Sequence, residues 1–127
     1  MTTLYRSMKS DSNGMPLCGP SARELGVRHE GDLPIGDDGV VRPGTGGMSV
    51  ALDDPMNLPP HRRPTRFKGW GPDPVWQIDE EDLPGSLVLR ADPEHPARHG
   101  FVESTKPMQL RDYQEALGAS RGTWNRT

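Results

Sequence analysis

Cysteine is almost absent from this sequence, since Cys18 is its only one. One thiol cannot form an internal disulfide or a metal site with several thiolate ligands, so nothing in the fold requires an oxidising compartment. We therefore expect no bound metal and a protein that acts in the cytoplasm.

Long apolar runs are missing as well. No segment approaches the roughly 20 apolar residues that cross a bilayer, and the polar N-terminal stretch MTTLYRSMKSDSN lacks the apolar core of a signal peptide. We expect no association with a membrane. If the protein leaves its cell, we expect delivery into a target cell by a machinery that needs no signal peptide.

Apolar side chains are few overall. They make up 31% of the 127 residues, whereas 15 residues are glycine and 14 are proline, a balance typical of loop-rich chains. The three tryptophans, two tyrosines and two phenylalanines are nevertheless spread from residue 5 to residue 124. Length and spacing together predict a single folded domain, residues 1–127, with long loops.

The charge is weakly acidic and uneven. A net charge of -3 gives no reason to expect a stable nucleic-acid complex, because such proteins normally carry a net basic face. Residues 61–68, HRRPTRFK, nevertheless contain four cations and no acid, and residues 79–82, DEED, contain four acids and no base. The basic segment is either a solvated loop or a surface that meets phosphate groups or a target.

Short apolar segments between turn residues predict an α+β fold. Strands are expected at residues 3–8, 48–52, 75–78, 83–90 and 99–105, and helices at residues 21–28 and 110–120. A proline-rich, irregular loop should run from Met56 to the third of these strands. Short strands and few helices favour a small mixed, mostly antiparallel sheet with short flanking helices.

A glycine run, GTGGMS, occupies residues 44–49. No lysine follows it as in a P-loop, and it precedes a predicted strand, whereas the dinucleotide fingerprint precedes a helix. We interpret the run as a flexible turn that leads the backbone into a strand and lets it approach a ligand closely. The strand that it leads into carries one hydroxyl, Ser49, among apolar residues.

Four polar residues lie on or beside predicted strands. Arg6 is on the first strand, Ser49 on the second, and His99 and Glu103 on the last. Arginine suits a diphosphate because its planar fork donates paired hydrogen bonds and stays charged. Each residue alone has an ordinary structural explanation, but the order arginine, serine, glutamate is the pattern of mono-ADP-ribosyltransferases.

Longer segments carry a more specific resemblance. In order and spacing, LYRSM, GTGGMSV, DLPGSLVLR and HGFVESTKPMQLRDYQEAL resemble a family of small bacterial toxins with a mono-ADP-ribosyltransferase-like fold. Members are type VI secretion effectors or stand-alone toxins with a neutralising partner. The resemblance implies a transferase-like split sheet, NAD as the cofactor, a cognate immunity protein or antitoxin, and an unidentified target macromolecule.

The resemblance also implies roles for particular residues. Arg6, Ser49 and Glu103 would form the catalytic set. Arg6 and His99 would hold the diphosphate or the adenosine ribose of NAD, and Ser49 would fix the geometry near the nicotinamide ribose. Glu103 would bond a ribose hydroxyl and stabilise the positive charge that develops as the bond to nicotinamide breaks, as in glycoside cleavage.

Two further residues belong to the implied NAD site. Gly47 would let the backbone approach the cofactor, and Trp70 or Trp76 would stack on the nicotinamide ring.

Two alternatives stay open. One is an NAD-using enzyme of the RNA 2'-phosphotransferase type, which would turn the basic loop toward RNA. The other is a catalytically inactive domain of the same fold that acts by binding a partner. Met48, which stands where the toxin family often has threonine, favours this second alternative.

Overall fold

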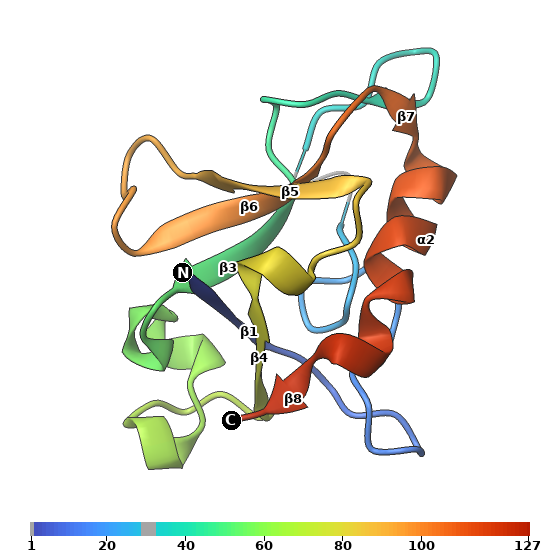
Figure 1. The fold of residues 1–127 in the computed structure, drawn as a ribbon. Helices are drawn as coiled ribbons and strands as arrows, with labels where there is room; N and C mark the ends of the chain where they lie inside the picture. Colours follow the sequence, from blue (N-terminus) through green and yellow to red (C-terminus); the bar gives the residue numbers. More distant parts are fainter. Residues whose placement is uncertain (1, 29–32) are drawn as a thin grey trace.

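The structure is a computed structural model that describes residues 2–28 and 33–127 (Figure 1). Its main sheet has six strands in the order β5-β6-β3-β1-β4-β8, and β2 pairs with β7 in a second, two-stranded sheet. All pairings between these strands are antiparallel. The fold is therefore a small α+β fold with a mostly antiparallel sheet, as the sequence predicts.

The elements have the following bounds. The strands are Thr3–Ser7 (β1), Val40–Val41 (β2), Met48–Leu52 (β3), Val75–Asp79 (β4), Leu87–Ala91 (β5), His99–Ser104 (β6), Met108–Gln109 (β7) and Asn125–Arg126 (β8), and the α-helix is Leu110–Ala119 (α2). Short 3-10 helices lie at Pro55–Asn57 (η1), Pro60–Arg62 (η2), Thr65–Phe67 (η3), Glu80–Asp82 (η4) and Arg121–Thr123 (η5).

Four of the five predicted strands begin where the sequence places them. The remaining predicted strand, at residues 83–90, begins only at Leu87. The Leu87 amide donates to the Pro84 carbonyl at 2.9 Å, and this closed turn separates Leu83, which caps η4, from the start of the strand. The two-residue strands β2, β7 and β8 were not predicted, because two residues are too few to show a period.

The predicted helix at residues 21–28 is wrong. Residues 21–26 form turns and bends apart from Leu25, which bridges to Cys18 and whose amide donates to the Leu17 carbonyl at 2.7 Å. A helix would use its own carbonyls internally. Here the carbonyls of Ser21 and Glu24 instead accept hydrogen bonds from Arg6 of β1. A tertiary contact thus replaces the local bonding on which the prediction rested.

The two faces of the main sheet bury different clusters. Side chains alternate between faces along a strand, so Leu4, Val50 and Val102 lie in a core cluster that also contains Leu117 of α2. Helix α2 lies along one side of the molecule and buries Tyr113 and Leu117, which are four residues apart (Figure 1). The predicted helix at residues 110–120 is therefore confirmed to within one residue.

A second, smaller cluster lies on the opposite face. Ala51 and Val75 from the sheet pack there with Leu58, and Tyr5 and Phe67 lie against them. Leu58 and Phe67 come from the proline-rich segment, which was predicted to be irregular. The segment instead forms η1, η2 and η3, visible in green beside the sheet (Figure 1), and so covers this face in an ordered manner.

Strands β1 and β3 pair over only two positions, Leu4 with Leu52 and Tyr5 with Ala51. Strand β1 pairs with β4 over five positions, and β3 pairs with β6 over four. The sheet thus consists of two well-paired halves joined by a short ladder. Beyond that ladder, the backbone groups of β1 and β3 need other partners.

No helix within residues 2–28 and 33–127 is long and apolar enough to cross a membrane.

Candidate functional site

A cavity of about 240 Å³ lies where the β1–β3 ladder ends. We call it the first cavity. Its described lining residues are Arg6, Ser7, Ala22, Arg28, Ser49, Val50, Ala51, Asn57, Leu58, Pro59, Arg62 and His99. The structure therefore brings together Arg6, Ser49 and His99, which the sequence singled out although 93 positions separate the first from the last.

Strand register explains why Ser49 and His99 meet, whereas Arg6 alternates to the face of Leu4 and reaches the Ser49 carbonyl beyond the end of the ladder. Ser49 is opposite Phe101 and Ala51 is opposite His99, so all four side chains lie on one face of the sheet. The rings of His99 and Phe101 are in edge-to-face contact, with centroids 5.0 Å apart. Because Tyr5 is opposite Ala51, the alternation along β1 places Ser7 on the same face as Ser49.

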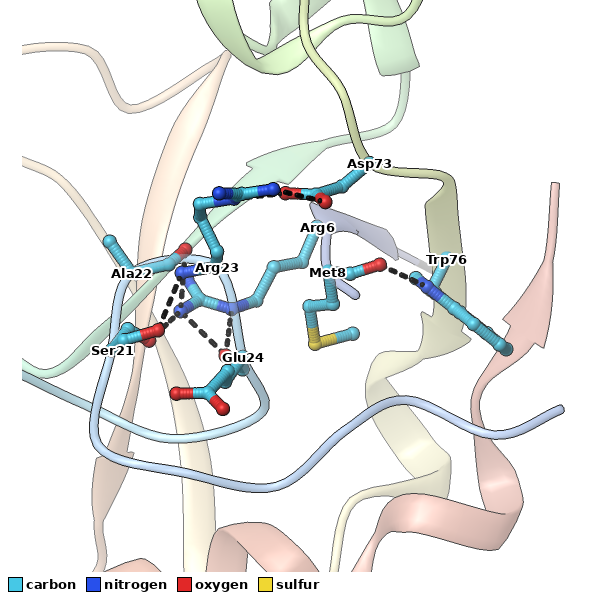
Figure 2. Close-up of polar contacts among 8 residues, drawn as sticks. All are labelled: Arg6, Met8, Ser21, Ala22, Arg23, Glu24, Asp73 and Trp76. Atoms are coloured by element: carbon cyan, nitrogen blue, oxygen red, sulfur yellow. Dashed lines mark hydrogen bonds and ion pairs between the residues drawn. The ribbon is translucent and has the colours of Figure 1, made fainter. Parts of the chain in front are cut away.

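Arg6 is held in a cage of backbone carbonyls. Its Nη1 donates to the Ser49 carbonyl at 2.7 Å, so the side chain supplies a partner for β3 beyond the end of the ladder. Its Nη2 donates to the Glu24 carbonyl at 3.0 Å and the Gly26 carbonyl at 3.2 Å. Figure 2 shows the guanidinium beside the turn that contains Ser21 and Ala22. Arg6 thus lines the cavity and also ties residues 21–26 to the sheet.

An ion pair also anchors the same turn. Arg23 donates from Nε and Nη2 to the two oxygens of Asp73, at 2.7 and 2.8 Å, in a bidentate arrangement (Figure 2). Asp73 is buried and precedes β4, so the turn is anchored to the strand on the other side of β1. One wall of the first cavity is therefore fixed by two arginines from different elements.

Two serine hydroxyls border the cavity without a hydrogen-bond partner among the described residues. Ser7 is only 3% exposed, and its Oγ makes no hydrogen bond within the described part of the chain. Ser49 is half-buried, and its Oγ likewise makes none to any described residue. A buried hydroxyl without a partner costs about 1–3 kcal/mol. Such a group beside a polar cavity is consistent with a ligand or water that completes its hydrogen bonds.

His99 is oriented by a carboxylate. Its Nδ1 lies 2.9 Å from Oδ2 of Asp92, which precedes it across the turn between β5 and β6. The Glu94 backbone amide and the His99 ring hydrogen-bond to this carboxylate and hold the pKa of Asp92 below its usual value. With Nδ1 protonated toward Asp92, Nε2 is left as an acceptor. No residue in the described ranges occupies Nε2.

The described wall of the first cavity carries cations and no carboxylate. Arg6, Arg28 and Arg62 all line it, together with the imidazole of His99. The side chain of Arg62 makes no hydrogen bond or ion pair with a described residue. Such a wall suits an anionic ligand with several hydrogen-bond acceptors, such as a phosphate ester.

Glu103 does not line the first cavity. It is 3% exposed, and its oxygens accept hydrogen bonds from the amides of Gly44 at 2.6 Å and Gly46 at 3.3 Å. Nε of Arg90 lies 3.0 Å from the same carboxylate. Both glycines have positive φ, 82° and 108°, which lets the turn aim its amides at this side chain. Glu103 therefore clamps the glycine turn onto β6, and its catalytic role stays a prediction.

Gly47 serves packing in this structure. A Cβ at this position would lie 2.6 Å from the Val102 carbonyl and 2.7 Å from the Tyr113 hydroxyl. That hydroxyl donates to Val102 and accepts from the Met48 amide. The close backbone approach expected of Gly47 exists, but it is made to α2 and β6 and not to the first cavity.

The two tryptophans predicted to stack on nicotinamide lie outside the first cavity. Trp70 is 72% exposed on the segment that follows η3. Trp76 is buried in the core cluster, and its indole nitrogen donates to the Met8 carbonyl at 2.9 Å (Figure 2). Aromatic character alone does not distinguish a core or surface side chain from a stacking platform.

Sequence reasoning missed three residues of the site. Ser7 and Asp92 were not considered, and Arg28 was assigned only to a helix end. Ser7 had a signal, since it lies next to Arg6 on a strand whose alternation sets its face. The contact of Asp92 with His99 depends on a seven-residue turn whose course the sequence does not reveal.

The described residues contain no group of three or more histidine, cysteine or carboxylate side chains that could hold a metal ion. Comparison of the chain with protein-family models, curated proteins and solved structures gave no match. The function is therefore argued from the geometry of the first cavity and from the sequence motifs.

Proposed function

We propose that this protein is an NAD-consuming mono-ADP-ribosyltransferase whose substrate site includes the first cavity. One observation carries the proposal. Arg6, Ser49 and His99, which the family resemblance implies as site residues, come from three strands and line one cavity.

The short ladder between β1 and β3 supports the same proposal. A transferase-like split sheet needs two halves that part at a cleft, and here the cavity lies where the pairing ends. Arg6 links β1 to β3 beyond the end of the ladder by donating to the Ser49 carbonyl. The side chain of Arg6 and the backbone of Ser49 are thus hydrogen-bonded where the β1–β3 pairing ends.

The polar groups of the wall fit part of NAD. Arg62 would face the diphosphate, for which a guanidinium group is suited by charge and shape. Arg6, whose guanidinium donates to the Ser49 and Glu24 carbonyls, would add positive charge to the same wall. The hydroxyls of Ser7 and Ser49 would bond ribose oxygens. The volume of about 240 Å³ lies below the ~300–1,000 Å³ typical of small-molecule sites, so only part of the dinucleotide would be enclosed.

The toxic role and its control are further parts of the proposal. Action on a target in the cytoplasm, and neutralisation by a cognate immunity protein or antitoxin, rest on the resemblance of LYRSM, GTGGMSV and the closing segment to the toxin family.

The bonding of Glu103 favours a second candidate. Both its oxygens are occupied by the glycine turn and by Arg90, which leaves no carboxylate in the described wall to stabilise an oxocarbenium-like state. A domain of this kind that binds a nucleotide or a partner without turnover fits that arrangement.

Nicotinamide release separates the two candidates. Purified protein is incubated with NAD, nicotinamide is quantified by chromatography, and NAD binding is measured by calorimetry. Ser49→Ala removes a hydroxyl that supports no hydrogen bond in the described fold, so the protein should fold normally but lose turnover. Ser12→Ala, on an exposed turn, is the matched control. Binding without release in the wild type would establish the second candidate, and equal release by Ser49→Ala and wild type would contradict the proposed site.

A further inference from the structure

A second cavity of about 450 Å³ adjoins the first. The two share four lining residues, Asn57, Leu58, Pro59 and His99, so they lie on either side of a common wall. His99 is the titratable member of that wall. Asp92 lines the second cavity only, which places the Asp92–His99 pair at the boundary between the two spaces.

We infer that His99, positioned by Asp92, is the general base that activates the acceptor in the proposed transfer, and that the acceptor enters through the second cavity. This inference rests on the proposed function. The geometry gives the base its position: Nδ1 is 2.9 Å from Oδ2 of Asp92, and Nε2 has no partner among the described residues. A carboxylate at Nδ1 fixes the ring and its tautomer and stabilises the imidazolium once it forms.

The proton balance is simple. His99 Nε2 takes the proton of an acceptor X–H as its X atom bonds to the anomeric carbon of the nicotinamide ribose. The bond from that carbon to the nicotinamide nitrogen breaks, its electron pair stays on nitrogen, and nicotinamide leaves neutral. The imidazolium then releases its proton to solvent. With water as X–H, the products are ADP-ribose, nicotinamide and one proton.

The surroundings of His99 support this assignment over Glu103. Glu103 is already bonded to two amides and to Arg90, and it lines neither cavity. The charged or titratable groups that line the two cavities with His99 are Asp92, His95 and Arg98 in the second and Arg6, Arg28 and Arg62 in the first. Among these described groups, Asp92 is the one that hydrogen-bonds to the His99 ring, and it holds the ring through Nδ1.

The test uses the full chain, NAD as the probe, and water as the acceptor. His99→Gln keeps a polar side chain that hydrogen-bonds but cannot take a proton. We expect its rate of nicotinamide release to fall by about 100-fold or more, the usual range for general-base catalysis, with a much smaller change in NAD affinity. The rate of the wild type should fall as the pH is lowered, because the imidazolium cannot accept a proton, and this dependence should disappear in His99→Gln.

Two further variants separate a base from a structural contact. Asp92→Asn keeps an acceptor for Nδ1 but removes its charge, so it should lower the turnover rate and change the pH profile without a matching loss of NAD affinity. Exogenous imidazole should restore release by His99→Ala. His61→Ala, an exposed histidine that lines neither cavity, is the control.

The outcomes distinguish the two proposals. Wild-type turnover with an unchanged rate and pH profile in His99→Gln would overturn the general-base assignment and leave the proposed function standing. A wild type that binds no NAD and releases no nicotinamide would overturn both.

Discussion

Substitution of Gly47 by alanine should destabilise the fold without touching the first cavity. The added Cβ would lie 2.6 Å from the Val102 carbonyl and 2.7 Å from the Tyr113 hydroxyl, and the first of these atoms belongs to the backbone of a central strand. Overpacking of this kind costs about 1–3 kcal/mol. If the Tyr113 ring shifts to relieve it, the Met48 amide and the Val102 carbonyl lose their side-chain partner, at about 1–3 kcal/mol for a buried unsatisfied group.

We therefore expect Gly47→Ala to lower the free energy of unfolding by about 2–4 kcal/mol, a large part of the usual total of 5–15 kcal/mol. Urea titration followed by tryptophan fluorescence measures the change. Gly122→Ala is the matched control, because a Cβ there meets no atom within 4 Å, and it should shift stability by at most about 0.5 kcal/mol.

A double variant tests the stated cause. In Tyr113→Phe the hydroxyl is gone, so part of the clash from Gly47→Ala disappears with it. The loss of unfolding free energy in the double variant should then be smaller than the sum of the losses in the two single variants, because contacting residues generally show such non-additivity. Strict additivity, or a Gly47→Ala variant as stable as Gly122→Ala, would refute the reasoning.

Three other predictions concern single side chains. Glu103→Gln should lower the unfolding free energy by about 1–3 kcal/mol, because a charged acceptor for the Gly44 amide is lost, and urea titration should show this whether or not NAD is turned over. Ser7→Ala should leave the unfolding free energy unchanged or raise it by about 1 kcal/mol, since it removes an unpartnered hydroxyl; a clear loss of stability would show that the hydroxyl is bonded. Asp92→Asn should flatten the dependence of melting temperature on pH below about 4. The lowered pKa of Asp92 stabilises the fold above the ordinary aspartate pKa, and this contribution is lost as the pH falls through the folded value, so equal acid sensitivity in wild type and variant would contradict the prediction.

The sequence predicted the elements whose signals are local. The segment Met48–Leu52 is apolar and bounded by turn residues, and it forms β3 with those bounds. The helix predicted at residues 110–120 owes its signal to apolar residues three and four positions apart, and Tyr113 and Leu117 are buried as that spacing requires. Where the local signal was weak, at residues 21–28, the hydrogen bonds of a distant side chain decided the conformation.

The site was predicted in part for the same reason. Alternation along the first strand predicts that Arg6 shares a face with Leu4. It does not reveal that the β1–β3 ladder stops after two pairs and that a cavity lies there, where Arg6 reaches the Ser49 carbonyl. The bonding of Glu103 depends on how the glycine turn folds back over β6, and that of His99 depends on the turn that carries Asp92. Such contacts depend on loop conformations, and loops leave no periodic pattern in the sequence from which their course could be predicted.

The carbonyl cage around Arg6 has a consequence for genetics. The same guanidinium joins β1, β3 and the turn at residues 21–26, so loss-of-function alleles at this codon will combine the loss of the proposed role in NAD binding with a misassembled wall. A screen for inactive variants will readily recover substitutions of Arg6, but it will not distinguish a loss of binding from a loss of correct folding. Alleles at Ser49 and Arg62, whose side chains support no described hydrogen bond, are the informative ones, and their ratio of soluble protein to activity will report on the site alone.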